Sequence, residues 1–340
     1  MAKKNNKNTS SERKPIKLIK RSEIAKNFTM AEAIDSMADA FASLSSGDCY
    51  VPKRYIINSQ DEKLTFLLKP AFVNNRDKAS IKILTQKNQN INGIPTILGV
   101  VLLIDNVTGE ILSLMDGEII TALRTGAASG LATKYLSRKD STKMALFGCG
   151  TQGKTQLKAV NEVRNLEKIW IFDKSKEAAE LFAREMSESV NADIEIADNL
   201  SVLKDVDIIC TATNSESPLF YKKHIKKGTH INAIGSYKPE MQELDPELIK
   251  SSLVYFDDKK NCLGESGDFK DITDESRMNN EFIIGEIGEC VLKEIEGRTS
   301  SDEITIFKSV GTAIQDLIVA NIIYDKSLIH NFGKEIKLYE

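Results

Sequence analysis

The chain contains 340 residues, enough for roughly two domains of ordinary size. Apolar residues make up 41% of the chain, and 46 basic residues nearly balance 49 acidic ones, which leaves a net charge of −3. This balance gives no electrostatic reason to expect nucleic acid or an anionic membrane as a partner. The longest apolar run, residues 94–104, contains proline and glycine and is too short to span a bilayer.

Five cysteines and three histidines are scattered along the chain without the spacing of a metal site or a disulfide framework, so no bound metal is expected. The basic, polar residues 1–14 precede no apolar segment, which predicts a disordered tail rather than a secretory signal. Together these features favour a soluble, cytoplasmic protein.

The first part of the chain predicts an α+β unit. A helix is expected over 29–47, because Thr29 and Glu32 have capping-box spacing and Gly47 can end the helix. Strand-like segments with a hairpin signal between the last two follow at 53–57, 64–68, 79–84, 96–104 and 111–115. A second helix, rich in small residues, is predicted from Gly117. The sheet before this helix should be largely antiparallel.

Beyond residue 143 the pattern changes to apolar strands that alternate with helices, which is typical of a doubly wound parallel sheet. The expected strands are 144–147, 168–172, 194–196, 206–213, 230–234, 253–256 and 304–308, and a last helix is expected over 312–324. The sequence therefore predicts an α/β protein, with a Rossmann-type sheet added to the α+β unit.

A glycine motif, G-x-G-x-x-G, lies between the first of these strands and the next helix. Gly148 would allow a tight turn, Gly150 a close approach of a pyrophosphate, and Gly153 close packing of helix on strand. The motif alone is weak, since a glycine-rich turn is the simpler explanation. The preceding strand, the following helix and an acidic residue at the expected distance strengthen it and predict a dinucleotide site.

That acidic residue is Asp173, twenty residues after Gly153 at the end of the next strand. Its carboxylate can accept hydrogen bonds from the adenosine ribose hydroxyls and would repel a 2′-phosphate. NAD(H) is therefore the favoured cofactor. The neighbouring Lys174 and Lys176 could soften this preference toward NADP(H).

Three cations in the first unit are candidates for holding an anionic substrate. Lys82 lies in the apolar strand ASIKILT, Arg124 lies on the apolar helix segment TALRTGA, and Arg54 follows Pro52 at the start of a strand. Each could instead be an ordinary solvated surface cation. The apolar neighbours of Lys82 and Arg124 favour burial, and a buried cation needs an anion.

Several of these segments resemble one known family. The stretches GEILSLMDGEIITALRTGAASGLATKYL, LFGCGTQG, IFDKS, HINAIGSYKPEMQELD and IFKSVGTAIQDL occur in the order seen in the ornithine cyclodeaminase/μ-crystallin family. The resemblance covers about residues 16–325. It implies a homodimer in which residues 15–125 plus 312–340 form a substrate-binding and dimerisation domain, and residues 126–311 form an NAD-binding Rossmann domain.

The resemblance also implies roles for individual residues. Arg54, Lys82 and Arg124 correspond to ligands of the substrate carboxylate, with Lys82 and Arg124 as the catalytic pair and Arg124 also next to the cofactor. The implied cofactor contacts are Thr151, Gln152, Asp173, Thr213 and the segment Asn232, Ala233, Ile234 and Gly235. The resemblance further implies contacts of Thr96 and Ser309 with the cofactor and of Val310 with the substrate.

One position departs from the ornithine cyclodeaminase pattern. Where those enzymes have an aspartate that handles the proton of the substrate amine, this chain has Tyr237. A tyrosine with an ordinary pKa near 10 is a poor base at neutral pH. Tyr237 is expected either to form a wall of the substrate pocket or to donate a proton, and cyclodeamination of ornithine is disfavoured.

The leading hypothesis is reduction of a small cyclic ketimine carboxylate, such as Δ1-pyrroline-2-carboxylate, to the cyclic L-amino acid. A protonated imine is already electrophilic, so this reaction needs positioning more than a base. The alternatives are an alanine dehydrogenase-type reaction, ornithine cyclodeamination, and a crystallin-like protein that binds ligand without turnover.

Overall fold

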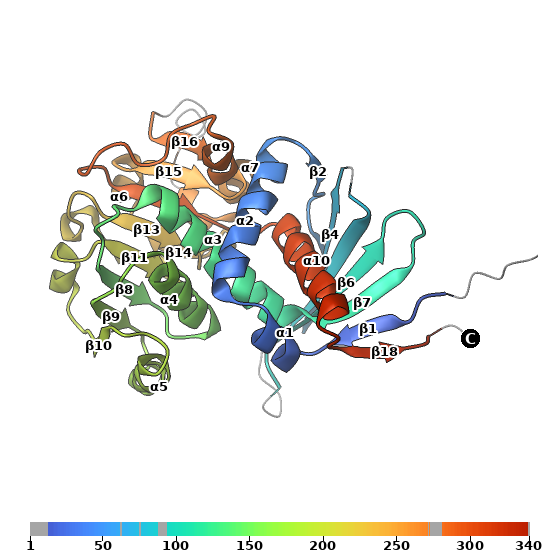
Figure 1. Ribbon diagram of the computed structural model, residues 1–340. Coiled ribbons are helices and arrows are strands. Elements are labelled where there is room, and N and C mark those ends of the chain that lie inside the picture. The colour runs from blue at the N-terminus through green and yellow to red at the C-terminus, as the bar shows by residue number, and fades with distance from the viewer. Residues whose placement is uncertain are drawn as a thin grey trace, which may run out of the picture.

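The computed structural model describes residues 13–61, 63–74, 76–87, 94–270, 272 and 281–338. The predicted tail, residues 1–14, lies outside the described residues except for the last two. Two eight-stranded sheets dominate the fold, and helices fill the space between them (Figure 1).

The first sheet is the α+β unit expected from the N-terminal sequence. Its order is β18 (Lys334–Ile336), β1 (Ile16–Ile19), β7 (Ile111–Asp116), β6 (Ile97–Asp105), β5 (Lys78–Lys87), β4 (Leu64–Val73) and β2 (Cys49–Tyr50), with β3 (Tyr55–Asn58) also paired to β4. All pairs are antiparallel except β1 with β7. Strands β1 and β18 were not predicted, because segments of four and three residues carry too little periodicity.

The second sheet is parallel throughout. Its order is β10 (Asp193–Ile196), β9 (Lys168–Phe172), β8 (Lys143–Phe147), β11 (Ile208–Thr211), β13 (His230–Ala233), β17 (Thr305–Lys308), β15 (Leu253–Phe256) and β16 (Ile283–Glu286). Hydrophobic cores lie on both faces, so the central strands β8, β11, β13 and β17 are buried along almost their whole length. Chain order reverses between β8 and β11, which is where a doubly wound sheet binds its ligand. The predicted Rossmann-type class is therefore confirmed.

The helices are α1 (Arg21–Asn27), α2 (Met30–Ser45), α3 (Gly117–Leu136), α4 (Thr151–Val163), α5 (Lys176–Ser187), α6 (Pro246–Lys250), α7 (Lys259–Glu265), α9 (Ile287–Leu292) and α10 (Ala313–Ile329). A small two-stranded sheet pairs β12 (Glu216–Phe220) with β14 (Gln242–Leu244). Short 3-10 turns occur at Leu200–Lys204, Lys222–His224 and Gly267–Phe269. No helix of the described part of the chain is long and apolar enough to cross a membrane.

Helix α3 connects the two sheets and packs closely on its neighbours because its residues are small. A Cβ on Gly126 would lie 2.5 Å from the carbonyl oxygen of Thr155 in α4, and one on Gly130 would lie 2.7 Å from Ile34 in α2. The predicted domain boundary at residues 125/126 falls inside this continuous helix. The division into two domains stays a prediction.

Candidate functional site

The loop between β8 and α4 has the geometry of a phosphate cradle. Gly148 has a φ of +98°, and a Cβ there would lie 2.5 Å from the carbonyl oxygen of Ala212. A Cβ on Gly153 would overlap the carbonyl oxygen of Gly148, so only glycine lets the helix pack on the loop. Nothing lies within 4 Å of a Cβ on Gly150, and this residue precedes α4 without a side-chain cap. The first N–H groups of α4 are thus available to an anion.

Asp173 lies at the rim of this cradle, just after β9. Its Oδ2 accepts a hydrogen bond of 2.7 Å from the N–H of Cys149, and its Oδ1 accepts one of 2.9 Å from the N–H of Ser175. The carboxylate therefore orders the glycine loop as well as facing solvent. Its remaining lone pairs are open to a ribose hydroxyl.

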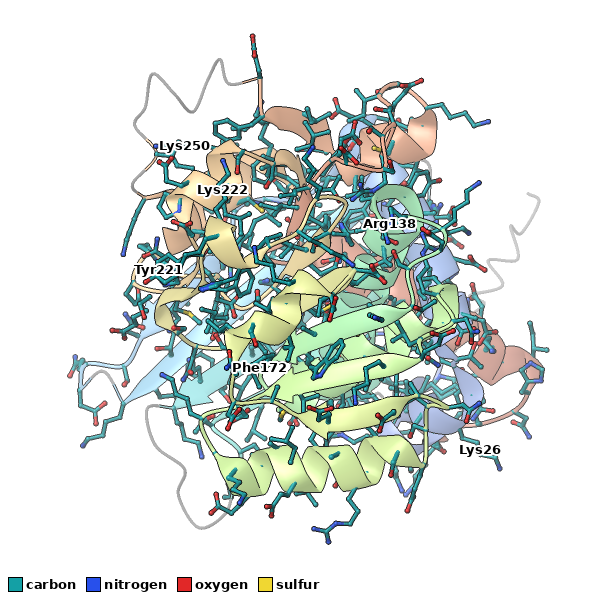
Figure 2. The ribbon with its side chains drawn as sticks, turned by 90° about the vertical axis from the view of Figure 1, so that its left-hand side faces the viewer. Lys26, Arg138, Phe172, Tyr221, Lys222 and Lys250 are labelled. Atoms are coloured by element: carbon teal, nitrogen blue, oxygen red, sulfur yellow. The ribbon has the colours of Figure 1, made fainter. Side chains whose placement is uncertain are left out.

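A pocket of about 560 Å³ opens at the carboxyl ends of β8, β9 and β11. The ring of Phe172, labelled in Figure 2 at the end of β9, stacks on Phe147 at 4.4 Å. The lining residues are Phe147, Gly148, Gly150, Phe172, Asp173, Lys174, Ala197, Asp198, Ala212, Thr213, Asn214, Ser215, Leu219, Tyr237 and Met241. The volume, the cradle and the acidic rim fit a dinucleotide.

Glu243, which the sequence did not identify, fixes the far side of this pocket. The buried carboxylate accepts hydrogen bonds of 2.7 Å from the hydroxyls of Thr211 and Thr213 and of 2.8 Å from the N–H of Gly235. Burial raises its pKa. Thr213 therefore reaches the pocket with its hydroxyl proton already committed to Glu243, and Gly235 must be glycine because a Cβ would overlap that carboxylate.

Residues 265–268, whose role the sequence left open, support the same network. Asp268 is completely buried and accepts hydrogen bonds from the N–H groups of Glu243 and Leu244, at 2.7 and 3.0 Å. Its second oxygen accepts one of 2.7 Å from the ammonium of Lys308 in β17. Asp268 thus ties β14 to the central sheet.

The predicted substrate cations meet at a buried carboxylate that the sequence did not reveal, Asp316 of α10. The ammonium of Lys82 donates a hydrogen bond of 2.8 Å to Asp316 and one of 3.0 Å to the hydroxyl of Thr121. Arg124 donates from Nε to Asp316 at 3.2 Å and from Nη1 to Gln315 at 2.9 Å. Both cations are buried, so neither is a solvated surface residue.

The electrostatics of this cluster follow from burial beside like charges. Burial and the neighbouring guanidinium of Arg124 lower the pKa of Lys82 to about 8, although Asp316 opposes the shift. For Asp316, burial would raise the pKa, but Lys82 and Arg124 outweigh it and hold the pKa below its ordinary value. Asp316 is thus an anion at neutral pH and is unsuited to accept a substrate proton.

Arg54 forms an ion pair with Glu265 of α7, so it bridges the two sheets. Burial, followed by the charge of Arg124, lowers its pKa. Arg54 is also close enough to Tyr237 to lower the pKa of that phenol, although burial raises it overall. Because Tyr237 lines the dinucleotide pocket, it connects this pocket to the cations.

The loop after β17 forms a second connection. Asp257 accepts hydrogen bonds from the hydroxyl of Ser309 at 2.6 Å and from the N–H of Gly311 at 2.8 Å. Gly311 has a φ of +78°, and a Cβ there would lie 2.5 Å from Nη1 of Arg124. Val310, between them, is buried. Ser309 is therefore bound to protein, and its predicted contact with the cofactor stays a prediction.

Of the other predicted cofactor contacts, some lie at the cradle and others lie away from the pocket. Thr151 and Gln152 open α4 at the cradle. Asn232 is buried, and its amide donates a hydrogen bond of 2.9 Å to the hydroxyl of Thr133, so its side chain is directed into the protein. Thr96 accepts a backbone hydrogen bond from Lys87 and is outside the set of described residues that line the pocket.

Ala233 and Ile234 are buried where β13 ends, in the strand next to β11, but neither lines the pocket that the structure describes. Contacts of Thr96, Asn232, Ala233 and Ile234 with a cofactor stay predictions.

The first sheet contributes a fourth cation that the sequence did not single out, Lys69 of β4. Its side chain is buried and its ammonium donates a hydrogen bond of 3.3 Å to the carbonyl oxygen of Gly311. The signals available in the sequence were a lysine in the apolar strand LLKPAF and an aspartate in the apolar helix AIQDLI. Each resembles a buried charge that needs a partner, but only the fold brings them together.

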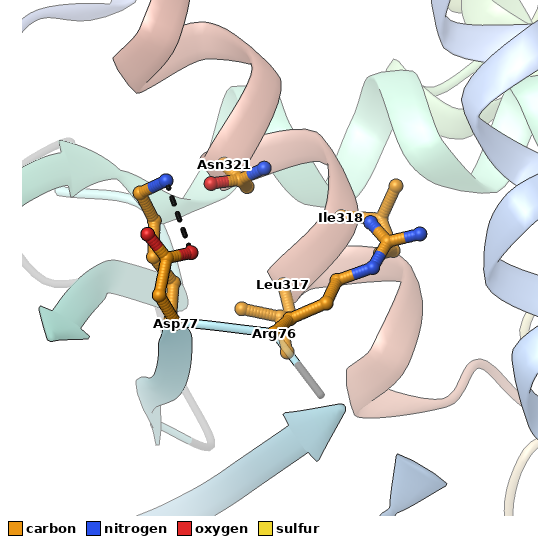
Figure 3. A pocket seen from close by; sticks show the side chains of 6 residues that line it. Arg76, Asp77, Leu317, Ile318 and Asn321 are labelled. Carbon is orange, nitrogen blue, oxygen red and sulfur yellow. Dashed lines mark ion pairs between the residues drawn. The ribbon is translucent and has the colours of Figure 1, made fainter. Parts of the chain in front are cut away.

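A smaller hollow lies between the β4–β5 turn and α10 (Figure 3). It is lined by Arg76, Asp77, Lys78, Leu317, Ile318 and Asn321 and has a volume of about 20 Å³. This is space for one water molecule and excludes a metabolite. Within the described ranges, no group of three His, Cys, Asp or Glu side chains could hold a metal ion.

Comparison with known families agrees with this architecture. Residues 16–331 match the model of the ornithine cyclodeaminase/μ-crystallin family. The chain belongs to this family. A Δ1-pyrroline-2-carboxylate reductase from Bacillus cereus is 34% identical over 311 residues, which cover 91% of this chain and 95% of the relative.

Two solved structures of family members are also similar. The Δ1-pyrroline-2-carboxylate reductase of Thermococcus litoralis, in complex with NADH and L-proline, is 38% identical, with a TM-score of 0.89 over 94% of this chain and all of the other. An archaeal alanine dehydrogenase dimer with bound NAD is 31% identical, with a TM-score of 0.85 over 95% of this chain and 99% of the other.

The glycine loop allows a matched pair of substitutions. Gly150→Ala should fold normally, because its Cβ meets open space, but it should weaken NADH binding at least about tenfold by intruding on the pyrophosphate. Gly153→Ala should lower the melting temperature, because its Cβ overlaps the carbonyl oxygen of Gly148. Fluorescence titration with NADH and thermal unfolding measure the two effects. Unchanged NADH affinity in folded Gly150→Ala would refute this assignment of the loop.

Asp316→Asn should lower the free energy of unfolding by about 3–5 kcal/mol at pH 7, because it leaves buried cations without a counter-charge. The pKa of Asp316 is depressed in the folded state, so its contribution is complete above the ordinary value of 3.8 and declines only as the pH falls below it. The loss should therefore be undiminished between pH 5 and pH 7 in urea unfolding.

The control for this experiment is Asp325→Asn, a half-exposed carboxylate of the same helix that pairs with Lys78 at 3.4 Å. It should change stability by less than about 1 kcal/mol. If the two substitutions had equal effects, Asp316 would not be the anchor of the cation cluster.

Proposed function

We propose that this chain reduces a small cyclic ketimine carboxylate of the Δ1-pyrroline-2-carboxylate type to the cyclic L-amino acid, with NADH as the hydride donor. The observation that carries the proposal is a group of cations, the buried Lys82 and Arg124 and the half-buried Arg54. Tyr237, which lines the dinucleotide pocket, lies within the electrostatic range of Arg54. The similar reductases act on the same class of compound, and the Thermococcus litoralis structure holds NADH and L-proline.

The residues present fit a dinucleotide. The free N–H groups at the start of α4 would hold the pyrophosphate, Gly150 leaves room for it, and Asp173 would accept hydrogen bonds from the ribose. Lys174 is also at the pocket, but the carboxylate at the rim favours NADH over NADPH. The bound dinucleotide supplies the hydride.

The cations would hold and orient the substrate. The substrate carboxylate would replace the water that Arg54 and Arg124 otherwise require, and Lys82 would add a third charge. The substrate reacts as the protonated imine: hydride adds to its carbon, the C=N electron pair moves to nitrogen, and the positive charge is neutralised. No residue has to remove a proton in this direction, which agrees with Tyr237 at the position where cyclodeaminases have a carboxylate.

Alanine dehydrogenase-type chemistry is less well supported, because it must also activate water and release ammonia. Asp316 is held as an anion by two cations, and Glu243 is enclosed by four donated hydrogen bonds. Neither is free to act as that base. Rates with pyruvate plus ammonia, compared with rates on the cyclic imine, separate the two activities. A cytoplasmic location stays the expectation from composition.

We also propose a homodimer. The outer face of the first sheet, which no helix of the described chain covers in Figure 1, is apolar. Its central residues are Leu68, Ile81, Ile83, Val100, Leu102 and Leu114, and the exposed Phe66 and Phe72 extend it. An apolar sheet face of this size needs a cover. The similar archaeal alanine dehydrogenase is described as a dimer.

The proposed activity is tested by NADH oxidation with Δ1-pyrroline-2-carboxylate and its six-membered homologue. Arg124→Ala should reduce kcat/KM by the equivalent of about 2–5 kcal/mol, because it leaves the substrate carboxylate poorly paired. The control is Arg184→Ala, an exposed arginine of α5. A loss below tenfold would remove Arg124 from the carboxylate site, and no NADH oxidation by the wild type on either imine would reject the function.

The dimer is tested by light scattering after size-exclusion chromatography. The wild type should have twice the chain mass of 37.8 kDa, and Leu102→Asp should shift it toward the monomer, because a carboxylate at the centre of the apolar face is costly to bury. Leu181→Asp, on the exposed face of α5, is the control and should remain dimeric. A monomeric wild type would contradict the assignment.

A further inference from the structure

Lys69 occupies an unusual place in the first sheet. It lies on β4 directly opposite Lys82 of β5, and both side chains are on the buried face. Two like charges in directly opposed positions of an antiparallel pair destabilise a sheet. A structure keeps such a pair inside only where an anion compensates it.

Asp316 forms an ion pair with Lys82 but not with Lys69. The carboxylate of Asp316 contacts Lys82 at 2.7 Å and Arg124 at 3.2 Å. The ammonium of Lys69 donates to the carbonyl oxygen of Gly311 at 3.3 Å, which is a long, uncharged partner. Among the described residues, the ion pairs include none for Lys69.

Four charged groups, from three elements and the segment before β3, face the Lys69 amine. These are Lys82 of β5, Arg54 before β3 and Arg124 of α3, which repel its proton, and Asp316 of α10, which attracts it. Burial and the three cations hold the pKa of Lys69 well below its ordinary range. Binding of an anion next to this amine would therefore restore its proton.

The charges in the cluster can be balanced one by one. Arg54, Lys82 and Arg124 face three carboxylates, Glu265, Asp316 and Asp257, the last of which acts on Arg54 and binds the N–H of Gly311, so these charges cancel. A protonated imine with one carboxylate is itself neutral and keeps the cluster balanced. Protonated Lys69 adds one further positive charge, which a monocarboxylate leaves unbalanced.

We propose that Lys69 forms a second anion-binding point in the substrate pocket, and that the preferred substrate is a cyclic imine with two carboxylates. This inference rests on the proposed imine reduction and specifies its substrate class. The chemistry is unchanged: the imine carbon gains the hydride, the C=N electrons stay on the protonated nitrogen, and the second carboxylate takes no part except in binding.

Two imines of equal ring size test the proposal, Δ1-piperideine-2-carboxylate and Δ1-piperideine-2,6-dicarboxylate. With NADH, the wild type should show a kcat/KM at least about tenfold higher for the dicarboxylate. In Lys69→Met the ratio of the two values should fall roughly 10- to 150-fold, the range for a lost hydrogen bond to a charged group. Lys69→Arg should retain most of the ratio, which shows that charge rather than packing is responsible.

Lys17→Met is the matched control. Lys17 is a buried lysine of the same sheet, and its ammonium donates to the carbonyl oxygen of Ser327 at 3.3 Å, away from the cluster. This substitution should leave the ratio unchanged.

A second readout detects the proton itself. Calorimetric titration with piperidine-2,6-dicarboxylate near pH 8, in buffers of different ionisation enthalpy, should show more proton uptake than titration with piperidine-2-carboxylate, and Lys69→Met should abolish the difference. If the wild type reduces the monocarboxylate without preferring the dicarboxylate, the inference fails and the proposed function stands. If neither imine is reduced, both fail.

Discussion

The site depends on one buried carboxylate. Asp316, on α10, faces Lys82 of β5 and Arg124 of α3, and all three side chains are excluded from water. Without this anion, Lys82 would have to be exposed or lose its proton, and Arg124, which stays protonated, would have to be exposed. With it, they can remain in an apolar interior and still carry the net positive charge that a small carboxylate needs.

Buried carboxylates also hold the second sheet together. Glu243 fixes the ends of β11 and β13 at the dinucleotide pocket, and Asp268 fixes Glu243 and the β17 lysine. The Arg54–Glu265 pair then links the two halves. The contacts that hold the dinucleotide pocket join residues at most 40 positions apart, whereas those of the proposed carboxylate site join residues 192 to 234 positions apart. Both sets lie on elements that the apolar cores keep rigid.

The sequence was sufficient for the elements and the cradle, because strand and helix periodicity and glycine spacing are local properties. Helix α2, with its Thr29 capping box, and seven of the eight strands of the parallel sheet were predicted within a few residues. The edge strand β16 was not predicted, because its four residues carry too little periodicity. Lys82 and Arg124 were identified because apolar neighbours surround a charge. Asp316, Glu265 and Lys69 were missed, since their roles depend on tertiary contacts with residues up to 242 positions away. Asn232 shows a different limit of prediction from the sequence. A motif can predict that a residue contacts the cofactor, but it does not reveal that the side chain is directed into the protein.

The most direct test of the account is a crystal structure of the protein with NADH and pyrrole-2-carboxylate, a planar carboxylate that cannot be reduced by hydride addition to an imine. The account predicts the carboxylate within hydrogen-bond distance of Arg54, Lys82 and Arg124, with the ring against the nicotinamide. A carboxylate bound elsewhere, with the three cations still occupied only by Asp316 and Glu265, would contradict it.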